Sequence, residues 1–205
     1  MKQDFLDGSI RRLNHIRRYS SYPVIRQENV AEHSFWIAFY AYRIGKELQY
    51  KYKEKVNYEA LLEKAMLHDF EESKIGDVVR TFKYYNDAIT TAMKDAEKKV
   101  TSDLFDELFE EEASKEVFKK WEAAKDVSLE GQIVMVSDMV CVFAYCIEEI
   151  ELGNKFAEKT LREAIDGFEK LVKTRIMSLV LVGVCADILE LAWQYDSRAL
   201  VFGRK

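Results

Sequence analysis

Apolar residues recur every three or four positions along most of this chain, the spacing of helices that bury one side. Its 205 residues include 8 glycines and 1 proline, so it offers few of the tight turns that join strands. The pattern predicts an all-α fold in a single domain over residues 1–205, with a core of about 4–158 and C-terminal helices packed on it over about 156–195. Within the core we expect helices over about 4–19, 27–48, 58–75, 87–112, 115–125 and 131–147, a polar connector over 50–57, and a short irregular or helical turn over 78–86.

The predicted helix over 131–147 is apolar on nearly every side, which is typical of a helix in the centre of a fold. Asp138 is its only charged residue. A lone carboxylate is rarely buried without a partner, because removing its charge from water is costly. Asp138 therefore needs a cation, which is either an arginine in a salt bridge or a metal ion.

A second polar cluster closes the predicted helix over 58–75, which Gly76 is placed to end. One stripe of this helix, which its apolar residues predict to face the core, begins apolar and ends in carboxylates: Leu62, Ala65, Met66, Asp69, Glu72. His68 adjoins the first of these acids. Imidazole nitrogen and carboxylate oxygen are common ligands of divalent metals, so this stretch is a candidate metal site. A packed or surface histidine is the alternative interpretation.

His33, one of 3 histidines in the chain, heads an apolar stripe of the predicted helix over 27–48, where Asn29 or Glu28 is the expected cap. It is either a core histidine hydrogen-bonded to a neighbour or a further imidazole ligand. Two neutral nitrogens and two negative oxygens would balance the charge of one divalent ion, and they are supplied by His33, His68, Asp69 and Asp138. Glu72 shares the face of the ligands without being needed as one, so it is a candidate general base.

Composition narrows the classes of function. Hydrophobic residues make up 48% of the chain and charged residues 33%, an ordinary globular balance. The formal net charge is -5 with no basic block, which argues against nucleic-acid binding. No signal peptide or membrane span is expected. The cysteines, Cys141, Cys146 and Cys185, lie in apolar segments without CxxC spacing and are expected to be reduced core residues of a cytoplasmic protein.

At these residues the chain resembles the HD-domain phosphohydrolases and, within them, the YfbR-like 5'-deoxynucleotidases. The superfamily pattern is a histidine, a later His-Asp pair and a distant aspartate, here His33, His68-Asp69 and Asp138. The surrounding blocks occur in the same order at similar separations: Arg18, residues 26–34 (RQENVAEHS), residues 68–72 (HDFEE), Gly76-Asp77, Lys83-Tyr84, Glu148-Glu149 and Gly153-Asn154.

The resemblance implies an all-helical HD fold and a homodimer. It implies one divalent metal ion on His33, His68, Asp69 and Asp138, most often cobalt or manganese, with magnesium, zinc, nickel and iron as further candidates. The implied reaction hydrolyses a small molecule, a deoxynucleoside 5'-monophosphate, to nucleoside and phosphate. In this reading Glu72 positions or deprotonates the attacking water, and Asp77 holds the water or the sugar. Arg18 grips the phosphate, and Tyr19 and Lys83 are further substrate-binding residues.

Two departures from the family pattern keep other functions open. Tyr19 stands where the family commonly has tryptophan, a position linked with rejecting the ribose 2'-hydroxyl, so the preference for deoxyribose stays undecided. Val79-Arg80-Thr81 replaces the usual Pro-Thr-Pro after Gly-Asp, and Arg80 adds a positive charge that suits a longer phosphate tail. The alternatives are therefore a deoxynucleoside triphosphate phosphohydrolase and a catalytically silent HD module that binds a nucleotide or a protein partner.

Overall fold

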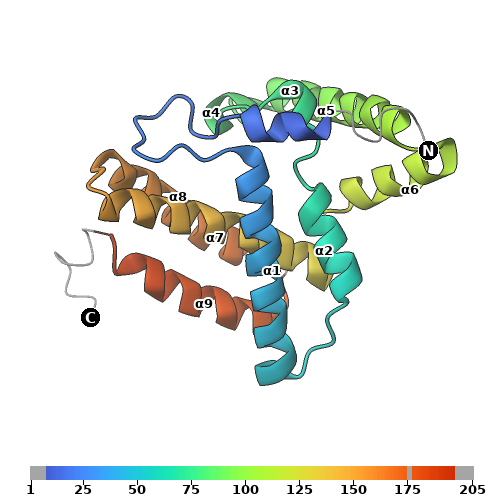
Figure 1. The fold of residues 1–205 in the computed structure, drawn as a ribbon. Helices are drawn as coiled ribbons and strands as arrows, with labels where there is room; N and C mark the ends of the chain where they lie inside the picture. Colours follow the sequence, from blue (N-terminus) through green and yellow to red (C-terminus); the bar gives the residue numbers. More distant parts are fainter. Residues whose placement is uncertain (1–7, 175–176, 197–205) are drawn as a thin grey trace.

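The structure is a computed structural model that describes residues 8–174 and 177–196. Its regular elements within these ranges are helices, which confirms the predicted all-α fold. Helix α1 (Val30–Tyr52) crosses α7 (Leu129–Glu151), and this crossing is the centre of the molecule (Figure 1). Three further helices pack against one or both of these: α2 (Tyr58–Leu67), α8 (Phe156–Thr174) and α9 (Leu179–Trp193).

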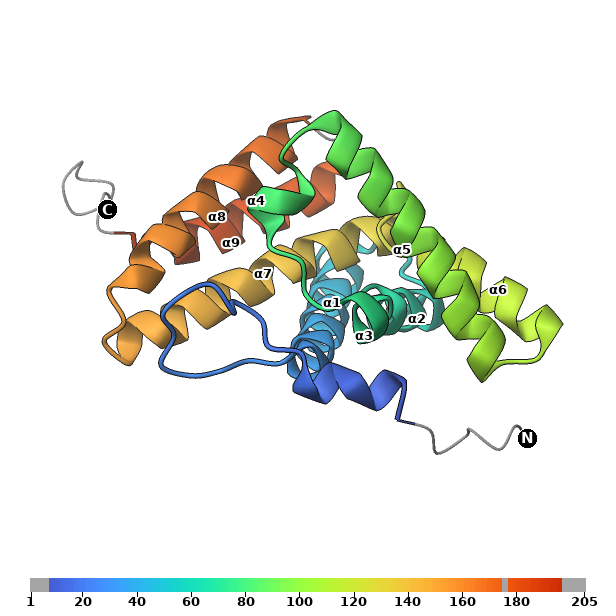
Figure 2. The same cartoon turned by 90° about the horizontal axis from the view of Figure 1, so that it is seen from above.

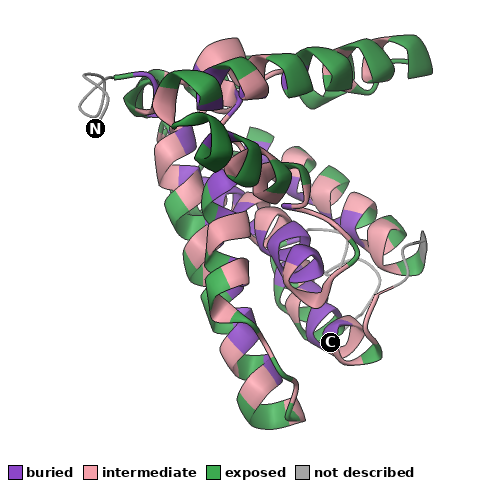
Figure 3. Ribbon diagram, turned by 90° about the vertical axis from the view of Figure 1, so that its right-hand side faces the viewer, coloured by how far each residue is buried: buried purple, intermediate pink, exposed green. Residues whose placement is uncertain are grey.

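Helix α7 is buried as its apolar sequence predicted. Ile133, Val134 and Val136 are inaccessible to solvent and belong to the same core cluster as Ile37 and Ile44 of α1. Figure 3 shows the buried positions gathered on the inward sides of these helices. Each buried aliphatic side chain of this size contributes roughly 1.5–3 kcal/mol to stability. The burial fixes the rotation of α7, and with it the direction in which Asp138 points.

Asn29 caps helix α1, one of the two caps expected from the sequence. Its side chain accepts from the backbone N–H of Glu32, and the Glu32 carboxylate accepts from the backbone N–H of Asn29. The helix runs to Tyr52, beyond the expected end near Leu48. It ends there because Lys53 takes a left-handed conformation (φ 62°) and donates its N–H to the Leu48 carbonyl. The polar connector is accordingly shorter than predicted and spans residues 53–57.

The expected helix over 4–19 is wrong in its second half. A short 3₁₀ helix, η2 (Ile10–His15), is followed by extended chain in which Arg17 pairs with Asn29 in an antiparallel bridge. Hydrogen bonds from Arg18 N to Glu28 O (3.0 Å) and from Val30 N to Ile16 O (3.1 Å) hold the two segments together. The apolar spacing did not reveal this long-range pairing. Residues 4–7 lie outside the described residues.

The expected helix over 58–75 is broken where the His-Asp pair lies. Helix α2 ends at Leu67, and α3 (Glu72–Ile75) begins after a turn whose bonds span three residues, such as Phe70 N to Leu67 O (3.1 Å). The stripe predicted to face the core is also wrong, because Leu62 and Met66 are 38% and 52% exposed. The buried side of this segment instead carries Leu61, Ala65 and His68.

The remaining helices lie to one side of the core. The turn predicted over 78–86 contains α4 (Arg80–Lys83), which lies above α7 (Figure 2). Helices α5 (Asp87–Leu108) and α6 (Glu111–Glu122) form a pair around Leu104 and Phe105. Helix α5 begins at residue 87 as predicted and ends before residue 112, whereas α6 begins and ends a few residues before its predicted bounds of 115 and 125. In the part of the chain that the structure describes, no helix is both long enough and apolar enough to cross a membrane.

Candidate active site

The structure brings together the four side chains predicted as metal ligands. His33 lies in the first turn of α1, His68 and Asp69 lie on the turn after α2, and Asp138 lies in the middle of α7. Asp69 Oδ2 is 2.9 Å from His68 Nε2 and 3.5 Å from His33 Nε2. Asp138 Oδ1 is 3.3 Å from His33 Nε2. Both imidazoles are buried, and His33, His68 and Asp69 form a group that could hold a metal ion.

The protonation of His68 shows why a cation fits between these groups. His68 Nδ1 lies 2.7 Å from the Ala65 carbonyl oxygen, so Nδ1 carries the proton and donates it. In the neutral imidazole Nε2 then presents a lone pair, and it faces Asp69 Oδ2 at 2.9 Å. Two acceptors at this distance repel unless a cation lies between them. A backbone carbonyl on the far nitrogen is also the usual way to orient a metal-binding histidine.

His33 is also suited to bind a metal ion through a neutral ring nitrogen. Among the described residues, neither of its ring nitrogens has a hydrogen-bond partner, although the ring is fully buried. Burial, together with the positive charge of Arg18, lowers the pKa of His33 to about 4. The ring is therefore neutral near pH 7 and can donate a lone pair to a metal ion.

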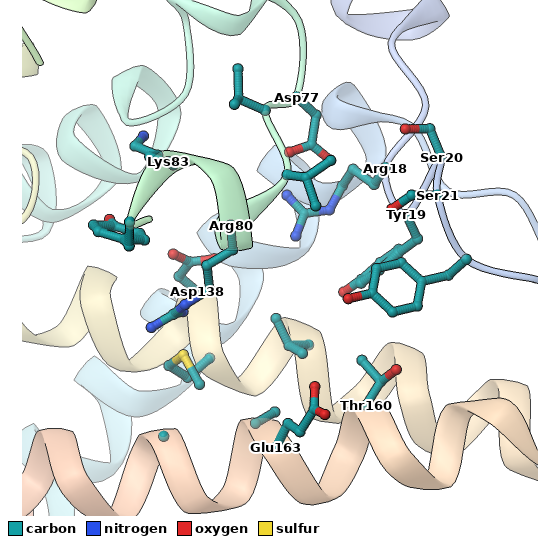
Figure 4. Close-up of a pocket in the computed structure, with 18 of the residues that line it drawn as sticks. Arg18, Tyr19, Ser20, Ser21, Asp77, Arg80, Lys83, Asp138, Thr160 and Glu163 are labelled. Atoms are coloured by element: carbon teal, nitrogen blue, oxygen red, sulfur yellow. The ribbon is translucent and has the colours of Figure 1, made fainter. Parts of the chain in front are cut away.

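A cavity of about 430 Å³ opens beside this cluster (Figure 4). Its walls come from the loop after η2, from α4, and from α7 and α8, and Thr160 and Glu163 of α8 close the side opposite α4. A volume of this order suits a small-molecule ligand. The cavity is lined by each residue that the sequence assigned to catalysis or substrate binding, namely Arg18, Tyr19, Glu72, Asp77 and Lys83, and also by Asp69 and Asp138.

Glu72 begins α3 and lines the cavity, and its Oε2 is buried without a hydrogen-bond partner in the described chain. Burial, together with repulsion from Asp69 and Asp77, raises the pKa of Glu72 to about 10. A cation bound at Asp69 would oppose this repulsion and favour the ionised form. Asp77 follows Gly76 (φ 79°), and burial and the Asp69 charge raise the Asp77 pKa, while Arg18 opposes that rise.

Arg18 points its guanidinium into the cavity (Figure 4). Its Nε lies 3.3 Å from Glu28 Oε2, and both side chains are largely buried. Gln27 Nε2 donates to the Arg18 carbonyl at 2.7 Å, which fixes the backbone as well. Glu28 was predicted only as a possible cap of α1, because its partner Arg18 lies across the bridge between Arg17 and Asn29, which the helical pattern does not reveal.

Two predicted substrate-binding residues are already engaged with neighbours. The Tyr19 ring stacks on Tyr145 with centroids 4.3 Å apart, and its buried hydroxyl has no hydrogen-bond partner among the described residues. Lys83 lines the cavity, but its Nζ lies 2.6 Å from Glu97 Oε1, so its charge is paired. Arg80 lines the cavity from the exposed α4.

The salt bridge considered for Asp138 exists, but its cation is a lysine rather than an arginine. Lys125 Nζ lies 2.6 Å from Asp138 Oδ2, while the other oxygen faces His33. Burial raises the pKa of Asp138, but Lys125 and His33 outweigh it and hold that pKa well below its usual range. Lys125 belongs to a segment rich in charge, to which the sequence assigned no chemistry.

The sequence model of a family described as 5'-deoxynucleotidase YfbR-like matches residues 5–180. This chain belongs to the YfbR-like 5'-deoxynucleotidase family. It is 32% identical over 164 residues to a 5'-deoxynucleotidase of Pectobacterium atrosepticum, covering 80% of this chain and 81% of the relative. It is 31% identical over 180 residues to a 5'-deoxynucleotidase of Photobacterium profundum, covering 85% and 88%.

Solved structures agree with this assignment. A crystal structure of an HD-domain phosphohydrolase from Listeria innocua superposes with a TM-score of 0.71 at 26% identity, covering 81% of this chain and 79% of that chain. The predicted resemblance is thereby confirmed. The YfbR-like protein is an enzyme, a phosphoric monoester hydrolase with the HD fold.

The last motifs that the sequence shared with the YfbR-like family hold the loop that leads into α1. Glu149 accepts hydrogen bonds from the backbone N–H groups of Ile25 (2.8 Å) and Arg26 (2.6 Å). Asn154 Nδ2 donates to the Pro23 carbonyl at 2.9 Å. These residues are distant from the cavity chemistry, but they fix the chain just before the helix that carries His33.

Proposed function

We propose that this protein hydrolyses deoxynucleoside 5'-monophosphates to deoxynucleoside and phosphate, using one divalent metal ion. The observation that carries the proposal is the group of His33, His68 and Asp69, in which Asp69 Oδ2 lies 2.9 Å from His68 Nε2 and 3.5 Å from His33 Nε2, beside a cavity of about 430 Å³. The family to which the chain belongs supports the choice of substrate.

In this proposal His33, His68, Asp69 and Asp138 hold the metal ion. When bound, such an ion lowers the pKa of a coordinated water and offsets charge on the phosphoryl group. Two imidazoles with two carboxylates suit cobalt or manganese, and zinc, nickel and iron are compatible; magnesium prefers oxygen ligands. The identity of the metal is therefore part of the proposal.

The side chains around the cavity have distinct roles in this reaction. Glu72 takes a proton from the attacking water, whose oxygen forms the new bond to phosphorus as the bond to the sugar 5'-oxygen breaks. That proton then passes from Glu72 to the 5'-oxygen, which leaves as the hydroxyl of the deoxynucleoside. Arg18, held by Glu28 through its Nε, keeps its terminal nitrogens for the phosphate oxygens. Asp77, close enough to Arg18 to feel its charge, holds the water or the sugar.

Product analysis tests the proposal directly. Purified protein is incubated with dAMP, AMP or dATP in the presence of cobalt or manganese, and the products are separated by chromatography. We expect deoxyadenosine and phosphate from dAMP, and no turnover after removal of the metal with a chelator. Release of triphosphate from dATP with dAMP left intact would contradict the proposal. The ratio of AMP to dAMP turnover reports whether Tyr19 permits a ribose 2'-hydroxyl.

A deoxynucleoside triphosphate phosphohydrolase is the second candidate, and Arg80 favours it. Arg80 lines the same cavity as Arg18 and Lys83, so a longer phosphate tail would meet a further cation. A silent HD module is the third, and it has no need for the buried, unpaired oxygen of Glu72. The dATP arm and the metal-dependence arm of the product analysis separate these candidates.

We further propose that the protein is a cytoplasmic homodimer whose subunits meet at the outer face of α1. The buried free thiols of Cys141, Cys146 and Cys185 support a reducing compartment. Phe35, Trp36 and Phe39 are 62%, 37% and 46% exposed and contact one another, an apolar face that a second copy would cover.

We expect Phe39→Glu to convert a dimer to a monomer, as measured by light scattering. The control is Glu59→Ala, at an exposed position of α2, which should leave the mass unchanged. A monomeric wild-type protein would contradict this part of the proposal.

A further inference from the structure

Lys125 lies on the turn between α6 and α7, and its side chain lines the cavity. Its Nζ is 2.6 Å from Asp138 Oδ2, and 34% of the side chain is exposed. The side chain therefore has two neighbours, the metal-binding cluster and the space left for substrate. An ammonium group has three donors, and the bond to Asp138 uses one of them.

The turn that carries Lys125 is held on both sides. Lys64 of α2 donates to the Ala123 carbonyl and lies 3.0 Å from Asp126 Oδ2. Asp126 Oδ1 accepts from the backbone N–H of Ser128 at 3.0 Å. Gly131 packs so closely that a Cβ on it would lie 2.7 and 2.8 Å from the Asp126 backbone nitrogen and oxygen. These contacts fix the backbone of the turn, which places the Lys125 side chain at the cavity.

The two oxygens of Asp138 have different neighbours. Oδ1 lies 3.3 Å from His33 Nε2, on the side of the proposed metal ion, whereas Oδ2 is held by Lys125. Lys125 therefore leaves one oxygen free for the metal. The contact fixes the carboxylate without competing for the proposed metal position.

The charge of a bound phosphate dianion would need positive partners besides the proposed metal ion. In the proposed complex a divalent ion balances Asp69 and Asp138, so a phosphate dianion still needs positive partners. Among the described residues that line the cavity, Arg18 is paired with Glu28, Lys83 with Glu97 and Lys125 with Asp138. Arg80 stands on an exposed helix. Lys125 is the cation in direct contact with a proposed metal ligand.

We propose that Lys125 binds the phosphoryl group of the substrate together with Arg18, which lines the same cavity. This inference rests on the proposed function of the site as a phosphatase. Lys125 donates to a phosphate oxygen with a hydrogen that Asp138 does not use, and its positive charge offsets the charge of the phosphoryl group. Arg18, Lys125 and a metal ion held by the proposed ligands would then each offset part of the charge of that group.

Inorganic phosphate is the probe that tests this role, because it binds without being turned over. Lys125→Gln removes the charge but keeps an N–H donor for Asp138, and Lys125→Met removes both. Each change is made in a Glu72→Ala background, loaded with manganese, and the dissociation constants of phosphate and of deoxyadenosine are measured by calorimetry. Metal content is measured on the same samples. The matched control is Lys120→Met, whose lysine pairs with Glu63 and Glu116 and does not line the cavity.

We expect both Lys125 variants to weaken phosphate binding by about 10–100-fold, the value of a hydrogen bond to a charged group. Deoxyadenosine binding and the saturated metal content should stay unchanged, and Lys125→Arg should retain most of the phosphate affinity. Unchanged phosphate affinity at full metal loading would overturn the inference, as would a loss of metal that explains the whole effect. If wild-type protein failed to hydrolyse dAMP while phosphate binding still depended on Lys125, the proposed substrate would fail and this inference would stand.

Discussion

Glu72→Ala is expected to reduce kcat for dAMP by about 10²–10⁴-fold, the usual contribution of a general base, while the protein keeps its metal. The Glu72 carboxylate lines the cavity, and its buried Oε2 has no hydrogen-bond partner among the described residues, whereas the proposed ligands Asp69 and Asp138 each lie within 3.5 Å of His33 Nε2. Its removal therefore takes away a proton acceptor and leaves the ligand set intact. Phosphate release from dAMP and metal analysis of the same sample measure the two effects.

Glu59→Ala is the control for this variant, because Glu59 is an exposed acid on α2 that does not line the cavity. It should leave both kcat and metal content unchanged. Near-full activity of the Glu72→Ala protein would show that Glu72 is not the base. A loss of metal together with activity would show instead that Glu72 belongs to the ligand set.

Asp138→Ala is expected to lose both activity and metal. Asp138 is the proposed ligand from α7, and altering even the groups that support a ligand typically lowers metal affinity by about 10–100-fold, so removal of the ligand itself should cost at least that much. Activity at limiting manganese should fall in parallel. The measurements are metal content after dialysis and phosphate release from dAMP over a series of manganese concentrations.

The alanine variant also leaves the Lys125 ammonium without its carboxylate, which could disturb the fold. Asp138→Asn keeps the shape and an oxygen for Lys125 while removing the charge, and we expect the same loss of metal from it. Glu151→Ala changes an exposed acid of the same helix and should leave metal content unchanged. Full metal content in both Asp138 variants would exclude Asp138 as a ligand.

The parts of the site that lie on long helices could be predicted from the sequence. Asp138 stood out because α7 is apolar on nearly every side, and a single charge in such a helix needs a partner. His33 stood out because it heads a buried stripe of α1. In both cases the helical period predicts the direction of the side chain. Because the helix is buried, an unpaired polar side chain on it would be destabilising, so a partner is expected.

The parts that depend on turns could not be predicted in this way. The His68-Asp69 turn breaks the helical period, so the stripe that placed Leu62 and Met66 in the core was wrong even though His68 and Asp69 are buried or nearly so. The sequence did not predict Lys125 as a site residue, because a lysine in a charged segment has the pattern of a solvated surface. Its position depends on Lys64 and Gly131, which are distant in sequence or carry no polar side chain.

The bridge between Arg17 and Asn29 has a consequence for motion. Arg18 and His33 lie on the two segments that this bridge joins, each within a few residues of it. The spacing between the guanidinium and the imidazole is therefore set locally, whatever the position of the α5–α6 pair. Lys125 follows α6, but its turn is held by Lys64 of α2 and by the close packing of Gly131 in α7. A displacement of α5 would instead reach the cavity through α4, because Lys83 of α4 pairs with Glu97 of α5.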